Sequence, residues 1–255
     1  MTLQAKVAVI TGSSRGIGRG IAERLAKEGA LVVIHCGSNA KAADEVVRAI
    51  ESKGGTAFAL QADLASVEEI QRFFERLDEN LVSRTGSNQF DILVNNAGIS
   101  SPAPYHQMTV EQFDHLFAVN VRGPFFVTQA AIARLREGGK IINISSLASR
   151  HASPSPFTAA YSMTKAALDA FTLALAQDLG QRKIVANTIA PGAVETDMNV
   201  QFLQKPEIRK VIEEQTALRR IGQAADIANV AAFLASDDNT WVTGQYIEAG
   251  GGFRL

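Results

Sequence analysis

The sequence predicts one doubly wound α/β domain over residues 1–255, with a parallel sheet flanked by helices. Apolar runs of strand length alternate with longer segments of helical period. The short runs are rich in Val and Ile and nearly unbroken, which is typical of strands buried on both faces of a sheet. No internal repeat, low-complexity tract or linker-like change in composition divides the chain.

The expected strands come in a regular order between the expected helices. The strands cover residues 6–11, 31–36, 90–95, 140–145, 184–190 and 244–250. The helices cover about residues 17–28, 40–53, 66–83, 109–137, 158–181 and 224–235, and their lengths suit crossover connections. Two stretches, 83–89 and 149–158, are polar or contain prolines, so we expect loops there.

The composition argues against several classes of protein. Lys and Arg total 25 and Asp and Glu total 26, so the net charge of −1 offers no footprint for nucleic acid or an anionic membrane. No apolar run approaches the roughly 18 residues that span a bilayer, and the N-terminus has no signal-peptide pattern. One cysteine, Cys36, excludes an internal disulfide and suits packing in a buried strand. The four histidines lack metal-site spacing, and we expect a cytoplasmic protein without a metal.

A glycine-rich loop follows the first expected strand. Its sequence, TGSSRGIG at 11–18, allows a tight turn into a helix and close approach of the backbone to a pyrophosphate. The helix N-terminus adds free N–H groups and a positive dipole end. The spacing is G-x-x-x-G-x-G rather than G-x-G-x-x-G. The position still predicts dinucleotide binding by a Rossmann-type sheet, through Gly12, Ser14, Arg15, Gly16, Ile17 and Gly18.

The end of the second expected strand favours NADP(H) over NAD(H). Sites that prefer NAD usually place a carboxylate there to bond the ribose 2′-hydroxyl. Residues 31–41 contain no acidic residue, so nothing there repels a 2′-phosphate. Arg15 is the candidate positive charge and Ser38 a candidate hydroxyl donor; the alternative for Arg15 is a solvated surface residue.

A tyrosine and a lysine lie four residues apart in YSMTK, residues 161–165. In a helix, Tyr161 and Lys165 share one face, and such pairs are common without any function. A cation beside a phenol also stabilises the phenolate, which is how an enzyme tunes a tyrosine for proton transfer. The pair alone does not decide between these interpretations.

Four motifs together resemble the short-chain dehydrogenase/reductase family. They are TGSSRGIG (11–18), NNAG (95–98), YSMTK (161–165) and PGAVET (191–196), in the family's order and approximate spacing. The resemblance covers nearly the whole chain and is closest to the branch containing 3-oxoacyl-acyl-carrier-protein reductases. It implies an NADP(H)-dependent oxidoreductase that interconverts a ketone, sugar or 3-oxoacyl carbonyl and a secondary alcohol by hydride transfer.

The resemblance also implies catalytic roles. Tyr161 would be the acid/base, and Lys165 together with the positive nicotinamide of the oxidised cofactor would lower its pKa. Lys165 would also bond the nicotinamide ribose. Ser146 matches the family's serine, which orients the substrate oxygen, but the stretch to Tyr161 is slightly longer than usual and Ser145 remains an alternative. Asn120 matches a helix asparagine thought to hold a water in the proton relay; its alternative is a polar residue that bonds the backbone.

Further cofactor contacts follow from the same resemblance. Asp63 would lie near the adenine, unless it caps the helix from about residue 66. Asn95 and Gly98 would line the floor of the pocket. Val194 and Thr196 would engage the carboxamide and so fix the nicotinamide face.

The resemblance leaves the substrate open. Residues of about 195–215 are expected to form a substrate lid, and His151 lies near the expected substrate loop. Members of the family are commonly homotetramers assembled through the helices near 109–137 and 158–181. A catalytically idle NADP(H)-sensing protein is the alternative function, disfavoured because the serine, tyrosine and lysine are all present. An epimerase or dehydratase usually requires a longer chain.

Overall fold

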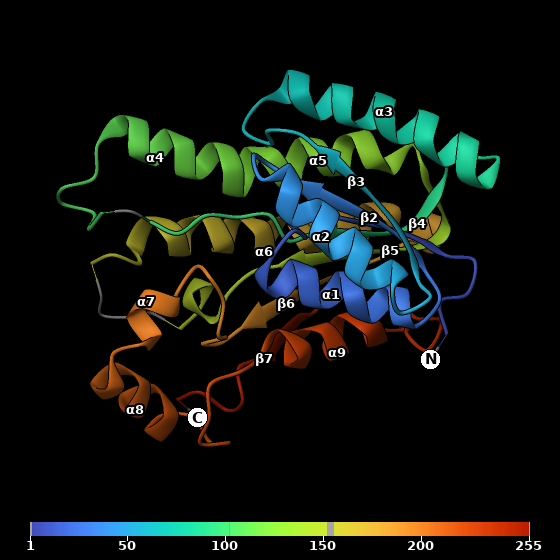
Figure 1. Ribbon diagram of the computed structural model, residues 1–255. Coiled ribbons are helices and arrows are strands. Elements are labelled where there is room, and N and C mark those ends of the chain that lie inside the picture. Colours follow the sequence, from blue (N-terminus) through green and yellow to red (C-terminus); the bar gives the residue numbers. More distant parts are fainter. Residues whose placement is uncertain (1, 102, 152–155, 255) are drawn as a thin grey trace.

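The computed structural model describes residues 2–101, 103–151 and 156–254, and its centre is a seven-stranded parallel sheet (Figure 1). The strand order is β3-β2-β1-β4-β5-β6-β7. The strands are β1 (Val7–Ile10), β2 (Leu31–Cys36), β3 (Thr56–Gln61), β4 (Phe90–Asn95), β5 (Leu135–Ile144), β6 (Val185–Pro191) and β7 (Tyr246–Ala249). The parallel sheet with flanking helices confirms the predicted fold class.

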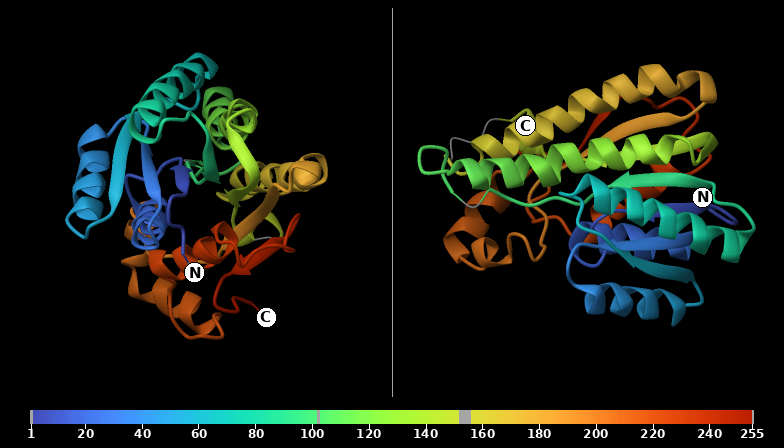
Figure 2. Two further views of the ribbon diagram at one scale, coloured as in Figure 1. Left: turned by 90° about the vertical axis from the view of Figure 1, so that its right-hand side faces the viewer. Right: turned by 90° about the horizontal axis from the view of Figure 1, so that it is seen from above.

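Helices cover both faces of the sheet (Figure 2). They are α1 (Gly16–Lys27), α2 (Ala40–Glu51), α3 (Val67–Thr85), α4 (Val110–Phe117), the π-helix η1 (Ala118–Arg122), α5 (Gly123–Ile132), α6 (Ala159–Leu179), α7 (Val200–Leu203), α8 (Pro206–Glu214) and α9 (Ala224–Ala235). Short 3₁₀ turns lie at η2 (Leu147–Ser149) and η3 (Gly180–Arg182).

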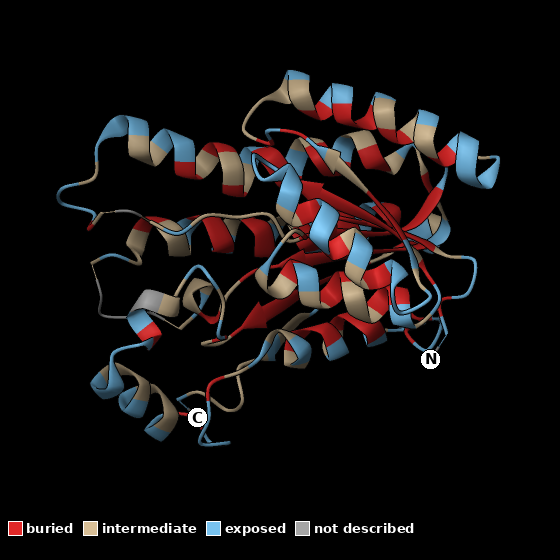
Figure 3. Cartoon of the chain, in the orientation of Figure 1, coloured by how far each residue is buried: buried red, intermediate tan, exposed pale blue. Residues whose placement is uncertain are grey.

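The core has two apolar layers because successive strand residues point to opposite faces. In β1, Ala8 and Ile10 pack with α1, α2 and α9 on one face. Val7 and Val9 pack with α3, α5 and α6 on the other. Figure 3 shows that the buried residues are concentrated in the strands and in the helix surfaces turned toward them.

The strand order reverses between β1 and β4, where the following loops diverge. In sheets of this kind a crevice opens at that point, outside the carboxyl ends of the strands. The glycine loop leaves β1 there, and residues 95–98 leave β4 beside it. A functional site is therefore expected at the carboxyl ends of β1 and β4.

Three sequence expectations differ from the structure. Strand β3 was not predicted, because Thr56–Gln61 contains one β-branched residue and forms an edge with partly exposed side chains. The helix expected at 109–137 is broken by the π-helix and ends at Ile132. Strand β5 begins at Leu135, before the expected start at 140, because Leu135 already pairs with Phe90. A register shift between Phe90 and Ile92 separates this pair from the regular pairing of the buried end of β5.

The loop expectations were right only in part. Helix α3 continues to Thr85 and ends at Gly86, whose φ of +76° suits a glycine cap. In the stretch expected as a loop at 149–158, residues 152–155 lie outside the described residues. No helix in the described parts of the chain has the length and apolar character needed to cross a membrane.

Candidate active site

The glycine loop is formed by backbone that approaches its neighbours too closely for side chains. Gly12 has a φ of +63°, and a Cβ there would lie 2.7 Å from the Cα of Ala97. A Cβ at Gly18 would lie 2.5 Å from the carbonyl oxygen of Gly12 and would collide with the Asn96 side chain. Helix α1 begins at Gly16, directly after the turn. The loop therefore presents bare backbone and a helix N-terminus at the crevice.

His35 and Ser13 fix the glycine loop to the ends of β1 and β2 by hydrogen bonds. The Nδ1 atom of His35 accepts the N–H of Gly12 at 2.9 Å, so Nε2 carries the proton and donates to the carbonyl of Ala62 at 3.0 Å. The Ser13 hydroxyl donates to Ile10 O at 2.7 Å and accepts the His35 N–H at 3.0 Å. Burial lowers the pKa of His35 to about 4, which keeps the ring neutral.

The sequence did not single out these two residues as parts of the site. A histidine inside an apolar strand gives no spacing signal. Only the register between β1 and β2 places His35 under the loop.

The NNAG stretch joins the glycine loop through its second asparagine. Asn96 Nδ2 donates to the carbonyls of Thr11 and Gly12, each at 2.9 Å. The Thr11 hydroxyl in turn accepts the backbone N–H groups of Asn96 and Ala97, both at 3.0 Å. These bonds fix the distance between the loops that leave β1 and β4.

Asn95, expected on the pocket floor, points its side chain into the core instead. It is 2% exposed, and its Nδ2 donates to Thr128 Oγ1 and Asn143 Oδ1, both at 2.9 Å. The physical reason is strand alternation: neighbouring residues at the end of β4 point to opposite sides. The Asn95 side chain therefore points away from the glycine loop, whereas the Asn96 side chain reaches it.

The three residues expected near the adenosine half of the cofactor lie at the surface. Arg15 is exposed at the N-cap of α1, and Ser38 is exposed just after β2. Asp63 is also exposed, and its Oδ1 accepts the N–H of Ala65 at 2.9 Å. The N-cap of α3 is Ser66, whose hydroxyl accepts the Glu69 N–H. The capping alternative for Asp63 thus applies to the preceding turn, not to the helix itself.

Tyr161, Lys165 and Ser146 come together at the carboxyl end of β5. Helix α6 places Tyr161 one turn before Lys165, with the lysine Nζ 5.7 Å from the centre of the phenol ring. A hydrogen bond with the Ser146 side chain acts on the Tyr161 phenol. The Ser145 hydroxyl donates instead to the backbone carbonyl of Lys165 at 3.2 Å. Of the two serines, Ser146 is therefore the one whose side chain meets the phenol.

In the polypeptide alone, burial has the largest effect on the pKa values of both Tyr161 and Lys165. Burial raises the pKa of Tyr161 to about 12, and the Ser146 hydrogen bond lowers it only in part. Lys165 is 4% exposed, and its Nζ donates to Ile144 O at 2.8 Å. Burial lowers the pKa of Lys165 to about 8, while the charge of Asp169 acts in the opposite direction. In the polypeptide, desolvation outweighs the Ser146 hydrogen bond, so the phenol pKa is not lowered.

Asn120 lies in the π-helix between α4 and α5 and is 1% exposed. Its amide forms a two-way clamp with Ile99: Oδ1 accepts the N–H and Nδ2 donates to the carbonyl, both at 2.9 Å. Nδ2 also donates to Thr164 Oγ1 at 3.1 Å. A π-helical turn at such a residue is common at functional sites. The residue thereby links the loop after β4 to helix α6.

Glycine and lid residues complete the surroundings of the pair. A Cβ at Gly98 would lie 3.3 Å from Asn120 Oδ1 and 3.4 Å from Lys165 Nζ, so this backbone borders both side chains. Thr196 lies over the glycine loop, with its Cγ2 3.5 Å from where a Gly16 Cβ would be. Val194 is buried and bridges to Gly222. The structure thus brings both halves of the predicted site to one edge of the sheet.

The sheet, the bare glycine loop and the serine–tyrosine–lysine group are typical of an oxidoreductase that uses a dinucleotide. The chain belongs to the short-chain dehydrogenase/reductase family, because the family profile described as "Enoyl-(Acyl carrier protein) reductase" matches residues 12–254. The predicted family and enzyme class are thereby confirmed.

Similar proteins cover the full length of the chain. An uncharacterized oxidoreductase of Methylorubrum extorquens is 45% identical over 99% of both chains. A hydroxynaphthalene reductase-like protein, Arp2, of Metarhizium majus is 40% identical over 98% of this chain and 96% of its own. The crystal structure of the angucycline C-6 ketoreductase LanV with bound NADP matches with a TM-score of 0.94. It is 42% identical and covers 100% of this chain and 97% of its own.

Proposed function

We propose that this protein is an NADP(H)-dependent reductase that converts a ketone into a secondary alcohol, with Tyr161 as the acid. The observation that carries the proposal is the meeting of Ser146, Tyr161 and Lys165 at the carboxyl end of β5, on the same edge of the sheet that the glycine loop leaves. Gly98 and Asn120 border the same place. A protein that only senses the cofactor would not need a half-buried phenol beside a buried amine.

The described residues fit a dinucleotide. Gly12 and Gly18 leave space that a Cβ would fill, and the N-terminus of α1 offers its free N–H groups to a pyrophosphate. Gly98 leaves the corresponding space beside Lys165. NADPH, when bound, supplies the hydride for the carbonyl carbon.

The proposed roles of the side chains follow from where they lie. The Ser146 hydroxyl bonds the substrate oxygen and holds it toward the phenol. Tyr161 donates its phenolic proton to that oxygen as the carbon accepts the hydride, and the tyrosinate is left. Lys165 places a positive charge next to that tyrosinate and bonds the ribose hydroxyls. Asn120 keeps the loop after β4 at a fixed distance from α6, the helix on which the Tyr161 tyrosinate must regain its proton.

NADPH is the preferred cofactor in this proposal. Residues after β2 carry no acidic side chain as far as Lys41, and Arg15 and Ser38 are both exposed at the mouth of the glycine loop. Asp63, Val194 and Thr196 are proposed to contact the remaining parts of the cofactor. The bound NADP in the angucycline ketoreductase supports this choice.

The proposed substrate is a bulky ketone on a fused aromatic ring system. The names of two relatives, a hydroxynaphthalene reductase-like protein and an angucycline ketoreductase, refer to such compounds. Four apolar side chains, Tyr105, Phe157, Met198 and Phe202, are more than half exposed. They belong to segments that gather beyond the carboxyl ends of the strands, at the left in Figure 1 and in the right-hand view of Figure 2. Exposed apolar side chains around one site favour an apolar ligand.

The segment from about 195 to 215 is proposed to be the lid of one continuous domain. It contains the short helices α7 and α8 and begins at Thr196, which lies against the glycine loop. Its far end is fixed, because Ala217 and Leu218 donate backbone hydrogen bonds to Gly252 and Gly251. A hinge at the near end would let α7 and α8 close over the substrate.

The test is a titration with NADPH and NADH, followed by nicotinamide fluorescence, and a turnover assay. The assay probes are 2-tetralone, an acetoacetyl thioester and pyruvate. We expect tighter binding of NADPH and turnover of 2-tetralone that is lost in Tyr161→Phe and reduced much more by Ser146→Ala than by Ser145→Ala. Tight NADPH binding without turnover of any ketone would favour the cofactor-sensing alternative.

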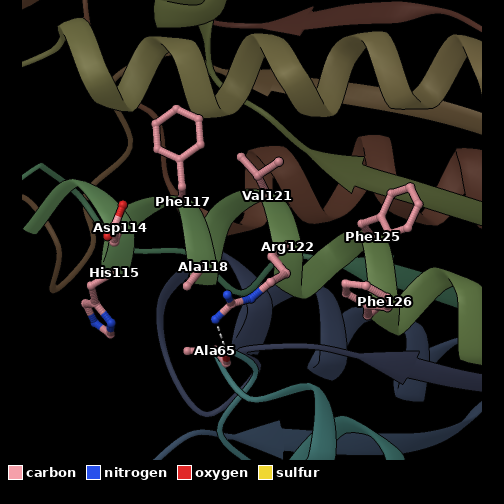
Figure 4. A pocket seen from close by; sticks show the side chains of 9 residues that line it. All are labelled: Ala65, Asp114, His115, Phe117, Ala118, Val121, Arg122, Phe125 and Phe126. Atoms are coloured by element: carbon pink, nitrogen blue, oxygen red, sulfur yellow. Dashed lines mark hydrogen bonds between the residues drawn. The ribbon is translucent and has the colours of Figure 1, made fainter. Parts of the chain in front are cut away.

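Assembly into a homotetramer is part of the proposal. Helices α4, η1 and α5 carry an apolar groove of about 770 Å³, lined by Phe117, Val121 and Phe125 and bordered by Arg122 (Figure 4). Phe125 also packs against Phe171 of α6 with ring centres 5.1 Å apart. These two helical segments are the ones expected to pair between subunits. Light scattering should give four times the 27.3 kDa chain mass.

A cytoplasmic location belongs to the same proposal. The only cysteine of the chain, Cys36, is buried, so the protein neither contains an internal disulfide nor offers an exposed thiol for one.

A further inference from the structure

Asp169 is a buried carboxylate that the proposed reaction does not use. It lies on α6 one helical turn beyond Lys165, so Tyr161, Lys165 and Asp169 follow one another along one face. Its side chain is 9% exposed. Among the described side chains, none donates a hydrogen bond of good geometry to either carboxylate oxygen, although the Ser149 and Ser145 hydroxyls lie close enough to act on its pKa. A buried carboxylate without hydrogen bonds is costly unless nearby positive charge compensates for it.

Arg150 supplies one such charge and leads back to the catalytic serine. Its Nε lies 4.0 Å from Asp169 Oδ2, and its guanidinium lies 3.8 Å over the ring of Tyr246. The Tyr246 hydroxyl donates to the backbone carbonyl of Ser146 at 3.1 Å. The Ser149 hydroxyl donates to the same carbonyl at 2.9 Å. Asp169 is therefore next to Lys165 along α6 and is connected to the turn that carries Ser146 through Arg150 and Tyr246.

The charges around Asp169 can be named for each neighbouring element. Helix α6 contributes Lys165 and Tyr161, the turn after β5 contributes Arg150, and β7 contributes Tyr246. Glu248 of β7 acts on Tyr246 and is paired with His151 at 2.8 Å.

The electrostatic effects on the carboxylate and on the lysine point in opposite directions. Burial raises the pKa of Asp169, and nearby hydroxyls, followed by Arg150 and Lys165, lower it. Asp169 in turn raises the pKa of Lys165 against the larger effect of burial. Asp169 is thus the group that opposes loss of the lysine proton.

We propose that Asp169 is a positioning residue that keeps Lys165 in its ammonium form beside Tyr161 and, through Arg150, holds the Ser146 turn against α6. Without this charge, the buried amine would release its proton in the neutral range and would no longer stabilise a tyrosinate. The catalytic meaning of the inference rests on the proposed function. Its electrostatic content concerns the polypeptide alone and can be measured without turnover.

The experiment follows the protonation of Lys165 directly. The full-length protein is labelled with ¹³C at the lysine Cε, the Lys165 signal is assigned by its loss in Lys165→Arg, and the pH is raised from neutral. We expect the wild-type midpoint near 8. In Asp169→Asn the midpoint should fall by about one pH unit, as expected for removal of a neighbouring opposite charge.

A matched control lies on the same helix. Asp178→Asn makes the same change of charge at an exposed position of α6, about two and a half turns further on, and should leave the midpoint unchanged. A midpoint in Asp169→Asn equal to that in Asp178→Asn would overturn the proposal. In Asp169→Glu the Lys165 midpoint should return at least part of the way to the wild-type value.

A second variant covers the case in which Asp169→Asn does not fold. Arg150 is half-exposed, and Arg150→Gln removes a positive charge near Asp169, so the Lys165 midpoint should move upward. A downward shift would contradict the proposed arrangement.

A pH profile of turnover adds a catalytic readout. Where a ketone is turned over, the loss of kcat at high pH should begin at a lower pH in Asp169→Asn than in the wild type, with little change in KM. If no ketone is turned over, the proposed function fails, while the lysine titration still decides the role of Asp169.

Discussion

The buried histidine under the glycine loop makes the stability of this protein depend on pH. The pKa of His35 is 6.5 in an unfolded chain and about 4 in the folded protein. As the pH falls through 6.5, the unfolded state binds a proton that the folded state still refuses. The free energy of unfolding therefore decreases as the pH falls from about 6.5 to about 4.

The size of the effect follows from these two pKa values. At pH 7 the protonation of His35 hardly changes the free energy of unfolding. At pH 5 it lowers the free energy of unfolding by about 2 kcal/mol. Below about pH 4 both states are protonated and the loss levels off near 3 kcal/mol. Protonation would also break the hydrogen bond from Gly12 to Nδ1, so the glycine loop should loosen over the same range.

The assay is urea unfolding of the wild type and of His35→Asn, followed by circular dichroism at pH 7 and pH 5 and at one protein concentration. The variant cannot titrate, so the advantage of the wild type over it should shrink by about 2 kcal/mol at pH 5. His106→Asn, which removes an exposed histidine, should lose stability in parallel with the wild type. If His35→Asn and the wild type also lose stability in parallel, His35 does not cause the pH dependence.

Two further predictions concern the loops that meet at the crevice. Thr11→Val leaves the N–H groups of Asn96 and Ala97 without their acceptor and should cost about 2 kcal/mol in urea unfolding at pH 7; a loss below about 0.5 kcal/mol would show that these bonds are replaceable. Gly98→Ala should unfold like the wild type but lower kcat for the accepted ketone about tenfold, because its Cβ crowds Lys165 Nζ. An unchanged kcat would place the reacting atoms elsewhere.

Strands with continuous β-branched residues were predicted well from the sequence. LVVIHC and FDILVN are the observed strands β2 and β4 to the residue. Their residues are buried on both faces, so the hydrophobic signal is unbroken. Strand β3 has no such signal, since an edge strand needs fewer apolar residues. Its existence follows only from its pairing with β2.

The site was predictable where chemistry is local and not where it depends on register. The spacing of Tyr161 and Lys165 on one helix face is a property of the helix alone. Whether Asn95 or Asn96 faces the glycine loop depends on where β4 ends, and one residue of difference reverses the side. The role of His35 requires two strands to be in register, and the pKa of Tyr161 depends on burial by several segments. None of these properties can be seen in a short stretch of sequence.

The π-helix has a consequence for changes in chain length. Each residue turns an α-helix by about 100°, so the wide turn at Ala118–Arg122 sets the rotation of α5 relative to α4. Deleting one residue there would allow a continuous α-helix, but it would rotate Val127 and Ala131 away from the core or move Asn120 away from Ile99. A surface loop tolerates insertions and deletions, whereas this helix needs its exact number of residues to keep Asn120 on Ile99 and Val127 in the core.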